Sequence, residues 1–122
     1  MKLLFASSDR DLLLCYGKLL QADGRTVLTA FDGPQLFTQL AGGAELVITD
    51  ARLPRLELKG LLRFLKEEGS AVILLINEKK TKELYRDLLP EEAFLPYPFT
   101  PFELEDKIRE ILKLKDTKAV TL

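Results

Sequence analysis

Residues 45–54, Glu45-Leu46-Val47-Ile48-Thr49-Asp50-Ala51-Arg52-Leu53-Pro54, carry the strongest structural signal in the sequence. The apolar run Leu46 to Ile48 does not alternate with polar residues, which predicts a strand that is covered on both faces. Such strands occur mainly in parallel sheets with helices on each side, and these sheets bind ligands at the carboxyl ends of their strands. Pro54 cannot continue a strand. We therefore expect Asp50 to lie at the mouth of a crevice.

The composition fits one globular domain. The chain has 122 residues, of which 47% are hydrophobic and 30% charged, enough to form a core. A formal net charge of -1 and the lack of a long apolar run argue against nucleic-acid and membrane partners. The single cysteine, Cys15, cannot form an internal disulfide and suits a cytoplasmic location; we expect it to be buried in a helix. The absence of histidine excludes imidazole catalysis.

Strand and helix patterns alternate along the whole chain. Strands are predicted at residues 2–6, 25–30, 46–50, 71–76 and 93–95, separated by amphipathic helical patterns and short turns. This alternation predicts an α/β fold, a flavodoxin-like doubly wound (βα)5 three-layer sandwich with a parallel sheet; the strand order 2-1-3-4-5 is assumed from that class. We expect one domain over residues 1–114 and a frayed C-terminal tail over residues 115–122.

Helix ends also have local signals. Ser8 is expected to cap the first helix with Asp11 three residues later, and Thr100 to Glu103 have the pattern of a capping box with proline at the first helical position. The polar segment 77–87 predicts the least stable helix. The helical residues expected to face the core are Leu12, Tyr16, Leu19, Leu20, Leu36, Phe37, Leu40, Leu58, Leu61, Leu62, Leu65, Ile108, Ile111 and Leu112.

Over nearly its whole length the sequence resembles the receiver domain of bacterial two-component response regulators, the CheY-like superfamily. The resemblance rests on the polar cluster Ser7-Ser8-Asp9, the segment LVITDARLP around Asp50, and the Pro-Phe pair of PYPFTP before the final helix. It implies that Asp50 stands where a histidine kinase delivers a phosphoryl group. It also implies Mg²⁺ held by two acidic residues after the first strand, a Ser or Thr after the fourth strand, and a Lys after the fifth.

Of the functional positions in this pattern, the chain keeps only the phosphoryl acceptor, Asp50. The acidic pair, the hydroxyl and the lysine are replaced by Ser7 and Ser8, Ile76, and Tyr97, respectively. Mg²⁺ is usually held by carboxylates, so two hydroxyls with Asp50 should bind it weakly even if Asp9 helps. Without metal and lysine, a transferring phosphoryl group has few stabilisers. We expect no catalytic residue, no metal and no cofactor, and Mg²⁺ only if Asp50 still accepts phosphate.

Two hypotheses concern the side chains around this crevice. Arg52 can place its guanidinium on Asp50 in place of a metal, or it can be a solvated loop residue. Phe94 matches the position of an aromatic that rotates when receivers are phosphorylated. Ile76, Phe94 and Tyr97 either hold the region in one arrangement or are ordinary core and rim residues.

These features favour a pseudo-receiver, a non-catalytic signalling module that acts by protein–protein contact. In receivers the fourth helix, fifth strand and fifth helix meet a protein partner or a second copy, and this switch and partner face would include Tyr85, Phe94, Phe99 and Phe102. The alternative is a phosphorylatable single-domain response regulator that accepts phosphate on Asp50. A flavodoxin-like cofactor binder is disfavoured, because no phosphate-binding loop follows the first strand.

Overall fold

A computed structural model describes residues 1–21 and 24–121, with residues 115–121 described by their backbone alone. Its strands form one parallel sheet in the order β2-β1-β3-β4-β5, which confirms the predicted class and strand order. The strands are β1 (Lys2–Ala6), β2 (Thr26–Ala30), β3 (Leu46–Asp50), β4 (Ala71–Ile76) and β5 (Phe94–Pro96). The helices are α1 (Arg10–Leu19), α2 (Gly33–Leu40), α3 (Leu58–Glu68), α4 (Lys80–Tyr85) and α5 (Pro101–Thr121), with a short 3-10 helix η1 (Glu91–Ala93).

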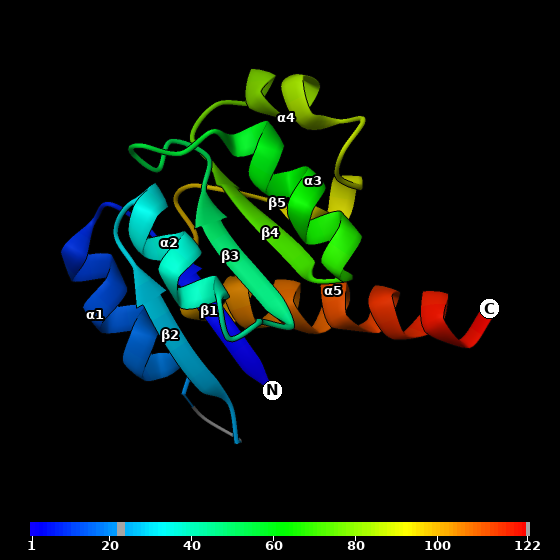
Figure 1. The fold of residues 1–122 in the computed structure, drawn as a ribbon, viewed down its shortest axis with the longest axis horizontal. Coiled ribbons are helices and arrows are strands. Elements are labelled where there is room, and N and C mark those ends of the chain that lie inside the picture. Colours follow the sequence, from blue (N-terminus) through cyan, green and yellow to red (C-terminus); the bar gives the residue numbers. More distant parts are fainter. Residues whose placement is uncertain (22–23, 122) are drawn as a thin grey trace.

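Helices cover both faces of the sheet, which explains the unbroken apolar runs of the central strands (Figure 1). One core cluster lies between the sheet and helices α2 and α3, and it includes Val47 and Leu61. The other lies on the face covered by α1 and α5, and it includes Phe5, Ile48 and Ile108. Successive strand residues point to opposite faces, so Val47 and Ile48 enter different clusters.

The start of α1 differs from the sequence expectation. Asp9, not Ser8, caps this helix, because its Oδ1 accepts the Leu12 N–H at 3.1 Å. A carboxylate at this place also interacts favourably with the helix dipole, which a serine hydroxyl does not. At α5 the predicted capping box is confirmed. The Thr100 N–H donates to the Glu103 carboxylate, and the Glu103 N–H donates to the Thr100 hydroxyl oxygen, each at 3.1 Å.

Some helical side chains expected in the core are exposed. Cys15 is exposed, so the prediction of a buried cysteine is wrong. Leu19 and Phe37 are 50% and 47% exposed, which also contradicts their assignment to the core. In α1 the inward stripe passes through Leu13 and Tyr16, which turns position 15 and position 19 toward solvent. The four leucines predicted on α3 are all buried, as expected, and Gly69 caps that helix in the left-handed conformation.

Helices α4 and α5 differ in how much of their surface is buried and in how far they extend. Helix α4 has no buried residue and no side-chain cap, in agreement with its polar sequence, and its low stability stays a prediction. Helix α5 continues to Thr121, so residues 115–121, expected to fray, have helical backbone, while Leu122 lies outside the described residues. Over the described ranges, no helix is both long and apolar enough to cross a membrane.

The loop after β3 is held against the turn between β2 and α2. The Gly33 N–H donates to the Pro54 carbonyl at 2.9 Å, and Arg55 Nη1 lies 3.7 Å from Asp32 Oδ2. The backbone of Arg55 passes so close to Gly33 that a Cβ on this glycine would overlap the Arg55 carbonyl group. Glycine at position 33 therefore allows the loop that follows Asp50 to lie on the start of α2.

Replacing Gly33 by alanine should lower the free energy of unfolding by about 1–3 kcal/mol, because the added methyl must displace backbone. Urea denaturation followed by circular dichroism measures this loss. Gly17→Ala is the control, since its methyl would meet only the Thr29 methyl at 3.4 Å and alanine favours a helix. Equal losses in the two variants would contradict the close approach at Gly33.

Candidate functional site

Asp50 ends β3 in the middle of the sheet, next to the carboxyl end of β1. Its side chain is partly buried, and both carboxylate oxygens have protein partners. Oδ1 accepts the backbone N–H of Arg52 at 2.9 Å, and Oδ2 accepts the hydroxyl of Tyr97 at 3.3 Å. The strand order brings Ser7, Asp9, Asp50 and Tyr97 together, as the resemblance implied for these positions.

Ser7 lies directly after β1 and beside Tyr97. It is fully buried, and its Oγ accepts the Asp9 N–H at 3.1 Å. The Ser7 side chain also interacts with the Tyr97 phenol and lowers its pKa, while Tyr97 itself donates to Asp50.

This environment raises the pKa of the Tyr97 phenol well above its ordinary value near 10.0. Burial is the largest cause, because it disfavours the phenolate, and repulsion by the Asp50 carboxylate comes next. The hydrogen bond from Ser7 opposes the shift and is outweighed. Tyr97 is thus a neutral donor to Asp50 throughout the physiological pH range.

A row of aromatic rings supports Tyr97 from the core. Phe5 is stacked on Tyr16 with ring centroids 5.9 Å apart, Tyr16 meets Phe99 edge-on at 5.6 Å, and Phe99 lies 5.1 Å from Tyr97. The Tyr16 hydroxyl donates to the Phe99 carbonyl at 3.3 Å. The peptide bond between Tyr97 and Pro98 is cis. Because Phe5 is fully buried, the row fixes the phenol at Asp50 to the hydrophobic core.

Ile76 and Phe94 do not form one cluster with Tyr97. They are 1% and 3% exposed in the core under α2 and α3, whereas Tyr97 packs on the other face of the sheet. The link between the two positions is a backbone bond, from the Tyr97 N–H to the Ile76 carbonyl at 2.8 Å. The three side chains therefore do not pack against one another as one group, and the hypothesis that they hold the region in one arrangement stays a prediction.

Arg52 contacts Asp50 through its backbone only. Its side chain is exposed, and within the described parts of the chain no ion pair joins its guanidinium to the Asp50 carboxylate. The expected internal cation at Asp50 is absent from this structure. The other hypothesis, that Arg52 is a solvated loop residue, agrees with the exposure of its side chain.

The four aromatic residues expected on a partner face differ in exposure. Phe94 is buried, and Tyr85 and Phe99 are half-buried against the two core clusters. Phe102 is 81% exposed in the first turn of α5. Leu84 of α4, which the sequence analysis did not single out, is 64% exposed. The exposed large apolar side chains on α4 and at the start of α5 are therefore Leu84 and Phe102.

The oxygen donors around Asp50 do not fit Mg²⁺, which requires near-octahedral ligation, usually through carboxylates and water. Asp9 uses Oδ1 to cap α1, and Ser7 is fully buried. Both oxygens of Asp50 accept protein donors. Over residues 1–21 and 24–121, no group of three or more acidic or cysteine residues is arranged to hold a metal ion.

Sequence and structure comparisons find similarity to one class of domain. No protein-family model matches the chain. It is 30% identical over 115 residues to the transcriptional regulatory protein CpxR of Klebsiella pneumoniae, with 92% of this chain and 49% of that protein covered. A receiver domain from Clostridium thermocellum has a TM-score of 0.78 and 25% identity, covering 95% of this chain and 97% of that one. A CheY-like receiver from Methanospirillum hungatei has a TM-score of 0.82 at 20% identity, covering 96% and 97%, and supports the fold.

The sheet order, the aspartate at the end of β3 and these comparisons show that the domain is similar to response regulator receiver domains of the CheY-like type. Escherichia coli CpxR is also 30% identical to it over 115 residues. The chain spans about half the length of the curated relatives it matches.

Replacing Tyr97 by phenylalanine should lower the free energy of unfolding by about 1 kcal/mol at neutral pH, because Asp50 loses a donor while the ring contacts remain. The phenol has a higher pKa in the folded state than in the unfolded state, so its contribution is complete below about pH 10 and is lost as the pH rises further. The difference between wild type and Tyr97→Phe should be constant near neutrality and shrink above about pH 10. Denaturant melts at a series of pH values measure it.

The control for this experiment is the same substitution in an Asp50→Ala background. Without the carboxylate, Tyr97→Phe should have a smaller effect, and the double-mutant cycle gives the coupling between the two side chains. Equal effects in both backgrounds would show that Tyr97 does not stabilise the protein through Asp50.

Proposed function

We propose that this domain is a pseudo-receiver, a non-enzymatic signalling module that acts by protein–protein contact and is not switched by magnesium-dependent phosphorylation. The observation that carries the proposal is the hydrogen bond from Tyr97 to Asp50. It places a neutral phenol at the position where the receiver pattern has a lysine cation. A donor that stays neutral can hold the carboxylate in place but supplies no positive charge to a phosphoryl group.

The charges near Asp50 support this proposal. A phosphoryl group would add roughly -1.5 to -2 charges next to the site. Ser7 and Tyr97 are neutral, and the nearby Asp9 carboxylate is negative and would repel that charge. The Arg52 side chain points into solvent, where its attraction is screened. Phosphoryl transfer depends on electrostatic stabilisation, which these residues do not provide.

The proposed contact surface is formed by the exposed apolar residues Phe102 and Leu84, on the helices that follow and precede β5. The Phe102 side chain is 81% exposed, so most of its apolar surface is removed from water only when a partner covers it. The partner would be another protein or a second copy of this domain. Exposed aromatic residues are often the residues that contribute most to binding at such interfaces.

Incubation with Mg²⁺ and acetyl phosphate should add no phosphoryl mass, and Mg²⁺ with beryllofluoride should not shift the amide resonances of Asp50 and Arg52. Intact-mass spectrometry and two-dimensional NMR measure the two responses. A magnesium-dependent mass increase that is absent from Asp50→Asn would establish the alternative, a phosphorylatable response regulator.

The positive control is a folded variant with Ser8→Asp and Tyr97→Lys, which returns a carboxylate and a cation to the positions named by the resemblance. Ser8 is exposed, so an aspartate fits there without burial of a charge. Magnesium-dependent shifts at Asp50 are expected in this variant. If it folds and stays inert, the replaced residues are not the cause of inactivity.

Replacing Phe102 by serine should leave the free energy of unfolding within about 0.5 kcal/mol, since the side chain is exposed. It should weaken self-association or partner binding by about tenfold or more. Analytical ultracentrifugation tests self-association, and pull-down from the native host tests another partner. Phe64→Ser on α3 is the aromatic control; equal binding by Phe102→Ser and wild type would contradict the proposed surface.

A further inference from the structure

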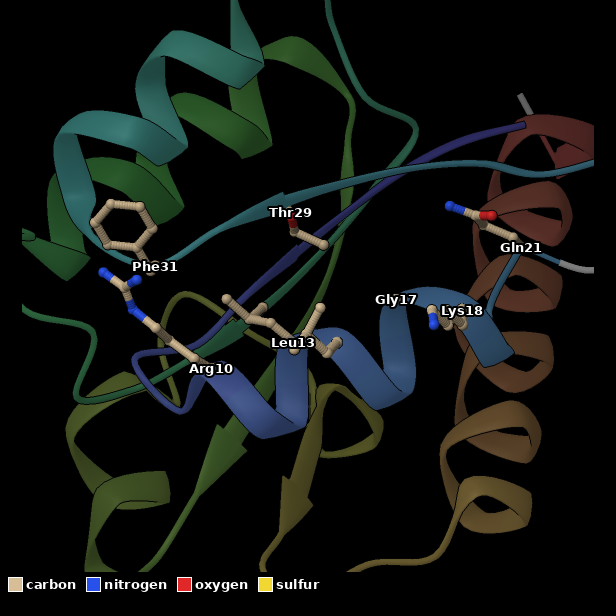
Figure 2. A pocket seen from close by; sticks show the side chains of 8 residues that line it. Arg10, Leu13, Gly17, Lys18, Gln21, Thr29 and Phe31 are labelled. Atoms are coloured by element: carbon tan, nitrogen blue, oxygen red, sulfur yellow. The ribbon is translucent and has the colours of Figure 1, made fainter.

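A groove between α1 and the end of β2 lies apart from the crevice at Asp50 (Figure 2). Its volume is about 410 Å³, within the range of ligand-binding clefts. Gly17 and Thr29 form its floor, where the glycine leaves room because it has no side chain. Leu14 and Phe31 line it and are 66% and 38% exposed, so large apolar surfaces are open to solvent there.

The cationic side chains of Arg10 and Lys18 lie on the same side of α1 as Leu14. Arg10, Leu14 and Lys18 are spaced four residues apart on α1, so they lie on one side of the helix at intervals of about 6 Å. The Arg10 guanidinium lies 4.9 Å from the centre of the Phe31 ring, which holds it over the groove, as Figure 2 shows. Among the described residues, neither cation has an ion-pair partner and no carboxylate lines the groove.

Side chains of α2 already occupy part of the neighbouring sheet edge. β2 pairs only with β1, but the outward Phe31 N–H donates to the Gln35 side chain at 2.7 Å and the Thr29 carbonyl accepts the Gln39 side chain at 3.3 Å. These amide groups satisfy backbone positions that an added strand would need. A molecule that binds here therefore does so through side chains that enter the groove.

We propose that the groove binds an extended acidic segment of a partner protein, in which one bulky apolar residue has Asp or Glu two positions before and two positions after it. Alternate residues of an extended chain lie on one side, about 6.6 Å apart, which matches the spacing of Arg10, Leu14 and Lys18. The apolar residue packs on Leu14 and Phe31, and the carboxylates pair with the two cations.

The probe for this proposal is a synthetic heptapeptide of sequence SESLSES, added to the full chain and followed by two-dimensional NMR. Shifts should be confined to α1 and the end of β2. Lys18→Glu and Leu14→Gln should each weaken binding by about fivefold or more. Lys66→Glu, an equivalent charge reversal on α3, should bind as wild type does, and Asp50→Asn should also bind normally. Circular dichroism confirms that each variant is folded.

Control peptides separate the contributions of charge, apolar contact and backbone form. SQSLSQS and SESSSES should both bind more weakly than SESLSES. Equal binding of either control, shifts that map to another surface, or no shifts at millimolar peptide would overturn the proposal. Tighter binding by a helical peptide with the same three side chains on one face would overturn the extended form of the occupant.

Discussion

The phenol of Tyr97 and the carboxylate of Asp50 are 47 positions apart in the sequence, and their hydrogen bond joins the last strand of the sheet to the central one. The aromatic row from Phe5 to Phe99 holds the phenol in place. The crevice is therefore organised around a neutral donor that belongs to the core. Receivers, as the family resemblance describes them, instead organise this place around a metal ion and a lysine.

Much of the fold could be predicted because its signals are local. The unbroken run at β3 implied two covered faces, and the Thr100–Glu103 pair marked a helix end, since each rests on residues close in sequence. The choice between Ser8 and Asp9 as a cap could not be made from the pattern, because either side chain can accept a helix N–H. Cys15 was wrongly predicted to be buried. The inward face of α1 lies one residue away from the predicted face, because Leu13 points into the core, and Cys15 therefore faces solvent.

The candidate site was predictable in position but not in its contacts. Asp50, Ser7 and Tyr97 could be placed at neighbouring strand ends, since the assumed strand order fixes which ends meet. The sequence did not show which side chain donates a hydrogen bond to the Asp50 carboxylate, because both Arg52 and Tyr97 can donate. The choice depends on the path of the folded chain. The role of Tyr16 was also missed: its spacing marked it as core, and its contact with Phe99 depends on a loop distant in sequence.

The phenol at Asp50 also gives this domain an optical property. The chain has three tyrosines and no tryptophan, so tyrosine emission is not masked by indole. An excited phenol is a stronger acid than one in the ground state, and a carboxylate that accepts its hydrogen bond quenches its light. We therefore expect the emission of Tyr97 to be weakened while it donates to Asp50, and to increase when an event separates the two side chains, without any added dye.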